Sequence, residues 1–257
     1  MLKENIMRPF KHIIVMGLGF IFSLALHSQE ATEIIKKADA KMQGETSSQS
    51  IMTMTIVRPT WQREITFKNW TKGRDYSLAL VTAPAREKGQ SFLKRENEMW
   101  NWNPTINRLI KLPPSMMSQG WMGSDFSNDD LLKESSIVVD YTHTIRGKEE
   151  MNGLNCYMIE LIPLEDAAVV WGRIVKWISE DEYLQMKSEY YDEDGYLIKT
   201  ELAYDIQTMD GRILPSRFEL IPEDEEGHKT IVVMEEIRFN QPIPDGFFSQ
   251  QNMKNVR

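Results

Sequence analysis

The residue types that catalyse reactions are few in this chain and lack the spacing that catalysis requires. Two of the four histidines fall within residues 1–28, which leaves His143 and His228, and no Cys/His pair has the spacing of a zinc site. The sequence contains no G-x-S-x-G nucleophile elbow and no glycine-rich phosphate loop. We therefore predict no catalytic residue, no metal and no cofactor.

The cysteine and the carboxylates have simple structural explanations. Cys156, the single cysteine, lies among strand-type apolar residues in "NGLNCYMIELIP", which favours a buried thiol over a nucleophile. The acidic runs at 190–195 and 223–227 are typical of solvated turns rather than of paired catalytic acids. An enzyme is the alternative interpretation, and no residue pattern supports it.

Methionine and tryptophan indicate a different kind of site. Between Met99 and Ser127 the chain holds three of its seven tryptophans and four of its sixteen methionines, interrupted by prolines and glycines. Flexible, polarizable methionines adapt to irregular gaps and varied partners, whereas a unique core favours Leu, Ile and Val. Each buried methylene of an alkyl chain contributes about 0.8 kcal/mol, so an apolar cavity could bind acyl chains without recognising charge.

The candidate lipid-binding residues come from alternating strands and from one irregular segment. Those on the strands are Met52, Met54, Ile56, Ile65, Phe67, Leu78, Leu80, Trp100 and Trp102. Those on the irregular segment are Met116, Met117, Trp121, Met122 and Phe126. The alternative is that all of them are ordinary core of a β-sandwich.

The elements that would position these residues follow from the hydrophobic period. Apolar residues at helical spacing predict one long helix over 30–44, closed by Gly44. Short segments of period two follow, joined by Asp-Gly and Asn-Gly turns, and predict an antiparallel barrel or sandwich. These segments are 50–57, 61–70, 75–84, 98–104, 107–114, 136–147, 155–163, 173–180, 184–195, 197–207, 213–224 and 229–239.

The segment 113–134 interrupts this pattern. Its first half, "PPSMMSQGWMG", has no usable period. Ser127, followed by Asp129 and Asp130, predicts the N-terminus of a short helix. We expect a loop with one or two helical turns, lying across the end or the face of the sheet.

The first 28 residues have the features of a cleaved signal peptide. Basic residues precede an apolar run at 13–26, and small residues follow. The alternative is a membrane anchor, but a spanning helix needs about 20 apolar residues. No linker-like tract divides the remaining chain, so we predict a signal peptide over 1–28 and a single domain over 29–257.

The net charge of the mature chain disfavours some classes of binding partner. Removing Lys3, Arg8, Lys11 and Glu4 with the leader leaves 27 basic and 37 acidic residues, a net charge of −10. Nucleic-acid binding needs a basic face, and docking on anionic lipid headgroups needs a basic cluster. We therefore predict no nucleic-acid partner.

Together these features resemble the LolA/LolB-like family of outer-membrane lipoprotein-sorting proteins. The most specific match is "MWNWNPTINRLIKLPPSMMSQGWMGSDFSNDDL" (99–131), and "FNQPIPDGFFS" (239–249) follows the last strand. The resemblance implies a mainly β fold, an incomplete antiparallel β-barrel of about 11 strands with an N-terminal helix and a helical lid insertion.

The resemblance also implies a function. It predicts a periplasmic carrier that binds lipoprotein acyl chains or other lipids in an apolar cavity between sheet and lid. The LolA-like subgroup linked to RND-type exporters implies an inner-membrane exporter and an outer-membrane acceptor as partners, and we expect a monomer. An accessory module that docks on an exporter without cargo is the alternative. The family's lid-holding arginine would be Arg63 or Arg108, and no motif identifies either.

Overall fold

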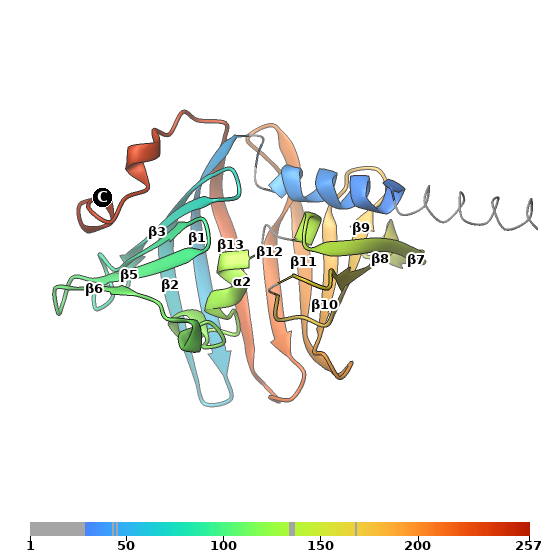
Figure 1. Cartoon of the computed structure of the whole chain (residues 1–257), viewed down its shortest axis with the longest axis horizontal. Coiled ribbons are helices and arrows are strands. Elements are labelled where there is room, and N and C mark those ends of the chain that lie inside the picture. The colour runs from blue at the N-terminus through green and yellow to red at the C-terminus, as the bar shows by residue number, and fades with distance from the viewer. Residues whose placement is uncertain (1–28, 43, 45, 134–136, 168) are drawn as a thin grey trace, which may run out of the picture.

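The computed structural model describes residues 29–257 except 43, 45, 134–136 and 168. The predicted signal peptide, residues 1–28, lies outside the described residues. Figure 1 shows one strongly curved sheet with the N-terminal helix and a helical insertion against it. Among the described residues, no helix combines the length and apolar character needed to cross a membrane.

The sheet is antiparallel throughout, with the order β6-β5-β4-β3-β2-β1-β13-β12-β11-β10-β9-β8-β7. The first strand therefore pairs with the last, and two consecutive meanders extend from that central pair. The strands are β1 (Ser47–Arg58), β2 (Trp61–Lys72), β3 (Tyr76–Ala83), β4 (Ser91–Arg95), β5 (Glu98–Asn103), β6 (Arg108–Lys111), β7 (Tyr141–Met151), β8 (Leu154–Pro163), β9 (Arg173–Ser179), β10 (Gln185–Tyr191), β11 (Leu197–Met209), β12 (Arg212–Pro222) and β13 (Lys229–Phe239).

The mainly β class is confirmed, and the expected strand number is corrected. The sheet is open and has 13 strands rather than about 11. The sequence pattern does not predict strand β4, "SFLKR", because four of its five residues are buried. A strand buried on both faces loses the apolar–polar alternation that identifies strands. In the segment predicted over 136–147 the strand begins at Tyr141, and residue 136 lies outside the described residues.

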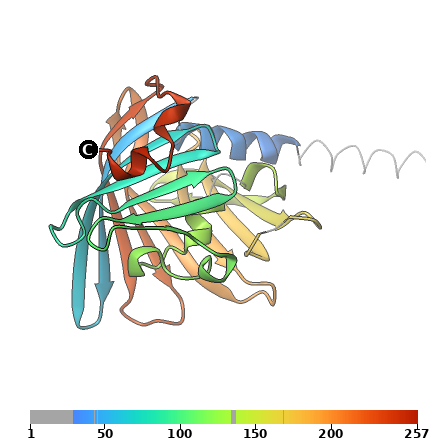
Figure 2. The same ribbon diagram turned by 60° about the vertical axis from the view of Figure 1, so that its left-hand side comes forward.

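The predicted N-terminal helix is present over residues 29–42. Its apolar stripe, Ala31, Ile34, Ile35 and Ala38, packs in one cluster with residues of β7, β8 and β9. Gly44, with φ of +80°, follows the helix, and its N–H donates to the carbonyl of Ala40 over 3.0 Å. This is the left-handed ending that glycine permits. The helix packs beside strands β7 to β9, at one end of the curved sheet (Figure 2).

The insertion, residues 113–133, differs in detail from a helical lid. It contains two 3-10 turns, η1 (Pro114–Met116) and η2 (Trp121–Gly123), before the short helix α2 (Asn128–Lys133). The predicted N-cap is observed, because the Ser127 hydroxyl accepts a hydrogen bond from the Asp130 N–H over 3.0 Å. Most of the insertion is therefore turn rather than helix.

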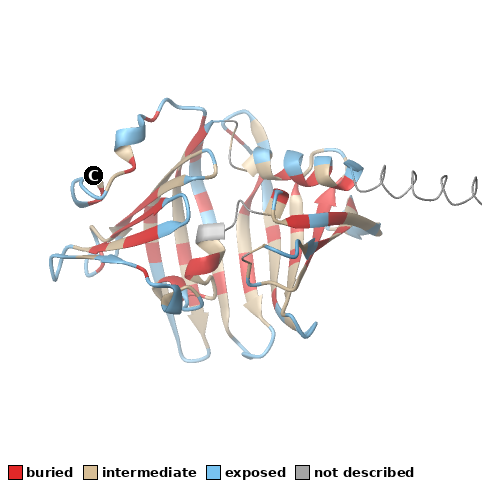
Figure 3. Cartoon of the chain, in the orientation of Figure 1, coloured by how far each residue is buried: buried red, intermediate tan, exposed pale blue. Residues whose placement is uncertain are grey.

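The C-terminal segment, residues 240–257, covers part of the other face of the sheet. It contains the 3-10 turns η4 (Asp245–Phe247) and η5 (Asn252–Lys254). Phe248 and Met253 are fully buried against Leu78, Trp100 and Trp102. Strands β3 to β5 thus carry buried residues on both faces, and Figure 3 marks the buried residues of the chain in red.

Candidate functional site

The main hollow of the described chain lies between the concave face of the sheet, the insertion and the C-terminal end of the N-terminal helix. Its volume is about 340 Å³, within the range of roughly 300–1,000 Å³ typical of small-molecule sites. Its apolar side chains come from β1, β2, β4 and the insertion, and also from the other meander, for example Phe218, Leu220 and Val232. The main contributors are Met52, Met54, Phe67, Phe92, Trp121 and Phe126.

The register of β1 and β2 determines which side chains face this cavity. Successive cross-strand pairs on the concave face are Ser48–Thr71, Ser50–Asn69, Met52–Phe67 and Met54–Ile65. Their side chains share one face because strand residues alternate with period two. On β1 and β2 the concave face therefore changes from polar to apolar, from the β2–β3 turn toward the insertion.

Trp121 closes the apolar end of the cavity. Its ring meets Phe67 edge-on at 5.4 Å between centroids and Phe92 at 5.2 Å. The side chain is only 5% exposed. Edge-to-face aromatic pairs add about 0.5–1.5 kcal/mol beyond the burial of apolar area. Aromatic packing thus holds the insertion against the sheet.

Two buried ion pairs fasten the insertion at its sides. Arg58 of β1 donates to Asp125 over 2.9 Å, with side chains only 12% and 7% exposed. Lys199 of β11 contacts Asp130 of α2 over 2.5 Å, and the Trp171 indole N–H donates to the same carboxylate over 3.3 Å. The insertion is therefore clamped to both meanders of the sheet.

Backbone contacts show which arginines reach the insertion. Arg63 of β2 donates to the carbonyl of Met122. Arg58 donates to the carbonyl of Gly123 over 3.1 Å in addition to its pair with Asp125. Arg108 lies exposed on the edge strand β6. Of the two arginines considered from the sequence, Arg63 contacts the insertion, and Arg58 was missed.

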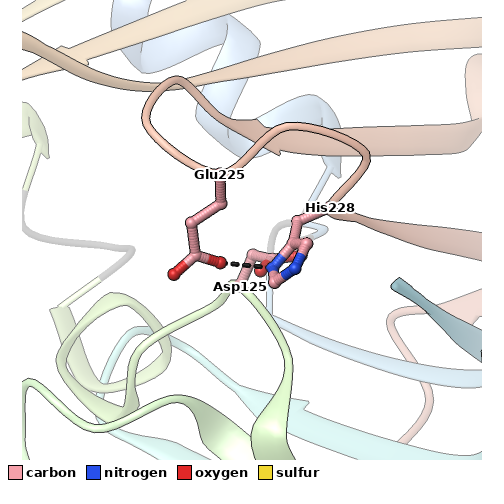
Figure 4. Close-up of side chains that lie close together, drawn as sticks. All are labelled: Asp125, Glu225 and His228. Atoms are coloured by element: carbon pink, nitrogen blue, oxygen red, sulfur yellow. Dashed lines mark ion pairs between the residues drawn. The ribbon is translucent and has the colours of Figure 1, made fainter. Parts of the chain in front are cut away.

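A cluster of Asp125, Glu225 and His228 lies beside the Arg58 pair. Figure 4 shows their side chains turned toward one another, one from the insertion and two from the β12–β13 hairpin, and their ligand-type atoms lie within 4.8 Å of one another. Such atoms can hold a divalent cation. Asp125, however, already accepts from Arg58 and from the Thr230 hydroxyl over 2.6 Å. We therefore assign the cluster to fastening the insertion.

The remaining reactive groups have structural roles. His143 is buried, with one ring nitrogen 3.0 Å from the Thr32 hydroxyl and the other 2.8 Å from the Ile137 carbonyl. Burial lowers the pKa of His143. Cys156 is fully buried, as predicted, and burial raises the pKa of its thiol to about 11. A thiol with such a pKa is a poor nucleophile at neutral pH.

Five predicted site residues line the cavity and others stand behind it. Those that line it are Met52, Met54, Phe67, Trp121 and Phe126. Ile56 and Ile65 are fully buried in the same apolar cluster, and Met122 packs against that cluster. Met117 packs instead against Met99 and Leu112, and Met116 is half-buried in η1. A lipid-binding role for these residues stays a prediction.

Four predicted residues lie on the face of the sheet opposite the cavity. Leu78, Trp100 and Trp102 pack under the C-terminal segment on the opposite face of the sheet. Leu80 is buried and shares that face by its two-residue spacing from Leu78. Alternation identified the faces correctly, but it could not say which face is concave. The neighbours Ala79 and Met99 border the cavity in their place.

Sequence reasoning missed the polar part of the cavity. Charged side chains on its wall include Lys176 of β9, Lys199 of β11 and Asp39 of the N-terminal helix. Burial raises the pKa of Asp39, and the opposing attraction comes from Arg74, whose guanidinium lies 2.9 Å away. The signal was present in the sequence, because polar residues continue the inward-facing positions of β1 and β2.

Comparisons with known proteins agree on the fold. A family model described as "-like: Uncharacterized protein" matches residues 73–255. A DUF1329 family protein from Desulfovibrio piger is 23% identical, with 88% of this chain and 99% of that chain covered at a TM-score of 0.80. No match was found among curated proteins.

Two further solved structures are similar over most of the chain. An outer membrane lipoprotein-sorting protein domain from Vibrio parahaemolyticus is 22% identical, covering 88% of this chain and 99% of that one, with a TM-score of 0.76. A LolA superfamily protein from Nitrosomonas europaea is also 22% identical, covering 86% and 98%, with a TM-score of 0.73. These similarities show the same curved-sheet architecture.

Proposed function

Because this chain belongs to a LolA-like family, we propose that it is a non-enzymatic carrier of lipids or lipoprotein acyl chains. It acts in the periplasm as a single domain over residues 29–257, after removal of residues 1–28. The cargo sits between the concave sheet and the insertion and moves toward the outer membrane. An inner-membrane exporter and an outer-membrane acceptor are the partners that this role requires.

The cavity wall is the observation that supports this proposal. Methionine and aromatic side chains from both the sheet and the insertion converge on one hollow of about 340 Å³. At about 0.8 kcal/mol per buried methylene, a chain of a dozen carbons would contribute roughly 10 kcal/mol before the costs of binding. This is ample for retention of a lipid in water.

The insertion acts as the cover of the cavity in this proposal. Trp121 seals the apolar end, and the pairs Arg58–Asp125 and Lys199–Asp130 hold the cover at its sides. Release of cargo requires these contacts to open. The ion pairs are suited to that purpose, because separated charges regain hydration that partly offsets the lost attraction.

Native mass spectrometry of the mature protein from a bacterial host tests the proposal. We expect a population that carries co-purified lipid, and a fluorescent fatty-acid probe should bind to delipidated protein. Val232→Trp, which fills the cavity, should reduce probe binding, whereas Val233→Trp on the exposed face of the same strand should not. A lipid-free protein that binds no probe would favour the docking module without cargo.

A further inference from the structure

We propose that the cavity is built for an amphiphile with an uncharged, hydroxylated headgroup. The headgroup would lie beside Ser50 and Asn69, and the hydrocarbon would extend under Trp121. This inference rests on the proposed carrier function and specifies its ligand class. The observations behind it are the change of polarity along β1 and β2 and two polar groups, the Ser50 hydroxyl and the Asn69 amide nitrogen, that have no hydrogen-bond partner among the described residues.

The concave face of β1 and β2 is divided into two halves. Ser48, Ser50, Asn69 and Thr71 form the half next to the β2–β3 turn, and Ser77 of β3 adjoins them. The next two cross-strand pairs are wholly apolar. From Ser48 to Met54, the last β1 residue that borders the cavity, the strand rises roughly 20 Å at about 3.3 Å per residue. This length, together with the change from polar to apolar side chains, suits an extended amphiphile better than a ligand of uniform polarity.

Ser50 and Asn69 have hydrogen-bonding capacity to spare. The Ser50 side chain is 5% exposed and borders the cavity. Within the described part of the chain, its hydroxyl has no hydrogen-bond partner. The Asn69 carbonyl oxygen accepts from Ser77 over 3.1 Å, whereas its amide nitrogen donates to no described residue. Asn69 is half-buried. A ligand with hydroxyl oxygens would supply hydrogen-bond partners to both groups.

Two cations of the cavity wall, Arg74 and Lys176, favour a neutral headgroup over an anionic one. Arg74 is paired with Asp39 over 2.9 Å. The Lys176 ammonium, 3% exposed as a residue, donates to Gln185 over 2.6 Å and to the Ser188 hydroxyl over 3.1 Å. Because these cations already have partners, an anionic headgroup would have to compete for them. Ser50 and Asn69 offer neutral donors and acceptors without such competition.

Competition binding with three twelve-carbon ligands tests the inference. The ligands are 1-monolauroylglycerol, methyl laurate, which lacks hydroxyls, and dodecyl phosphate, which is anionic, each displacing a fluorescent probe from the mature protein. We expect monolauroylglycerol to bind about tenfold more tightly than methyl laurate, the effect of one or two net hydrogen bonds. Dodecyl phosphate should bind more weakly than monolauroylglycerol.

Variants assign this preference to the polar half. Ser50→Ala and Asn69→Leu should each bring the two neutral ligands within about threefold of each other, while methyl laurate affinity stays unchanged. Thr66→Val is the matched control, because Thr66 bonds Thr53 on the other face of the same strands. Circular dichroism confirms that each variant folds, and Ser50→Ala is the mildest change.

The outcomes separate the inference from the proposed function. If wild-type protein binds methyl laurate and monolauroylglycerol equally, it carries hydrocarbon and the headgroup site is overturned. Tighter binding of dodecyl phosphate overturns the choice of an uncharged headgroup. Failure of methyl laurate, monolauroylglycerol and the probe to bind overturns the carrier function itself and the headgroup site with it.

Discussion

At the residue scale, Asp125 connects the insertion to several distant parts of the chain. It accepts hydrogen bonds from Arg58 and Thr230 and lies beside Glu225 and His228. These partners come from β1, β13 and the β12–β13 hairpin. The Asp125 carboxylate thus links the insertion to the strands at the centre of the sheet.

Removing the Asp125 carboxylate should destabilise the folded protein. We expect Asp125→Ala to lower the free energy of unfolding by about 3 kcal/mol, because it leaves the Arg58 guanidinium buried without its charge partner. Urea unfolding of both proteins at pH 7 measures the difference. Glu225→Ala is the control, since Glu225 is 52% exposed and its ion pair should contribute under about 1 kcal/mol. A loss below 1 kcal/mol for Asp125→Ala would contradict the clamp.

Cys156 permits a second test at this scale. Burial raises its pKa to about 11, so the thiol stays protonated at pH 8 and is shielded from reagents. We expect no reaction with a thiol-specific chromogenic disulfide over an hour in native buffer, and full reaction in guanidinium chloride. Rapid labelling of the native protein would show that β8 is accessible.

At the element scale, the N-terminal helix and the insertion cover neighbouring parts of the same concave face. The helix is held by its apolar stripe and by the contact of Thr32 with His143. The insertion is held by Trp121 and by ion pairs. The helix was predictable because one repeated spacing forms its buried face, whereas the insertion depends on contacts with distant strands.

His143 should make the helix attachment sensitive to acid. Its pKa is lowered in the folded protein, so below about pH 6.5 the unfolded state binds a proton that the folded state resists. Above about pH 6.5 neutral His143 contributes its full share to the free energy of unfolding. That contribution is lost as the pH falls toward the lowered pKa of the folded state. His143→Gln should flatten the stability curve between pH 7 and pH 5. An unchanged slope would exclude this role.

The insertion should loosen when its tightest turn is disturbed. A Cβ on Gly120 would lie 2.4 Å from the Ser124 carbonyl oxygen, so Gly120→Ala must displace backbone. We expect faster hydrogen exchange over 113–127 and a red-shifted emission from Trp121, identified by difference from Trp121→Phe. Gly246→Ala is the control, because no atom lies within 4 Å of its added Cβ. Equal exchange in both variants would argue against a tightly fitted cover.

At the scale of the whole molecule, the two faces of the sheet have different tasks. The concave face borders the cavity, and the C-terminal segment seals the other face over β3 to β5. This separation predicts that stability and ligand binding can be altered independently. One substitution on each face of the sheet tests this prediction.

Phe248→Ala should reduce stability without affecting the cavity. Phe248 is fully buried against Leu78 and the strand tryptophans, so its removal should cost about 3–5 kcal/mol. Probe affinity, measured at a temperature where the variant stays folded, should match wild type. Val232→Trp provides the opposite case, with reduced probe binding. A joint loss of stability and affinity in Phe248→Ala would show that the two faces are coupled.

The sequence by itself determined the β class, the long first helix, the capped start of α2 and the buried cysteine. Each rests on a local period or on neighbours in the chain. Only the tertiary structure decided which face of each strand borders the cavity. Met99 and Trp100 are neighbours in a strand and therefore lie on opposite faces, Met99 toward the cavity. Trp100 is buried as well, because the C-terminal segment folds back over it. When both faces of a strand are buried, the alternation of apolar and polar residues that would identify its inner face is lost.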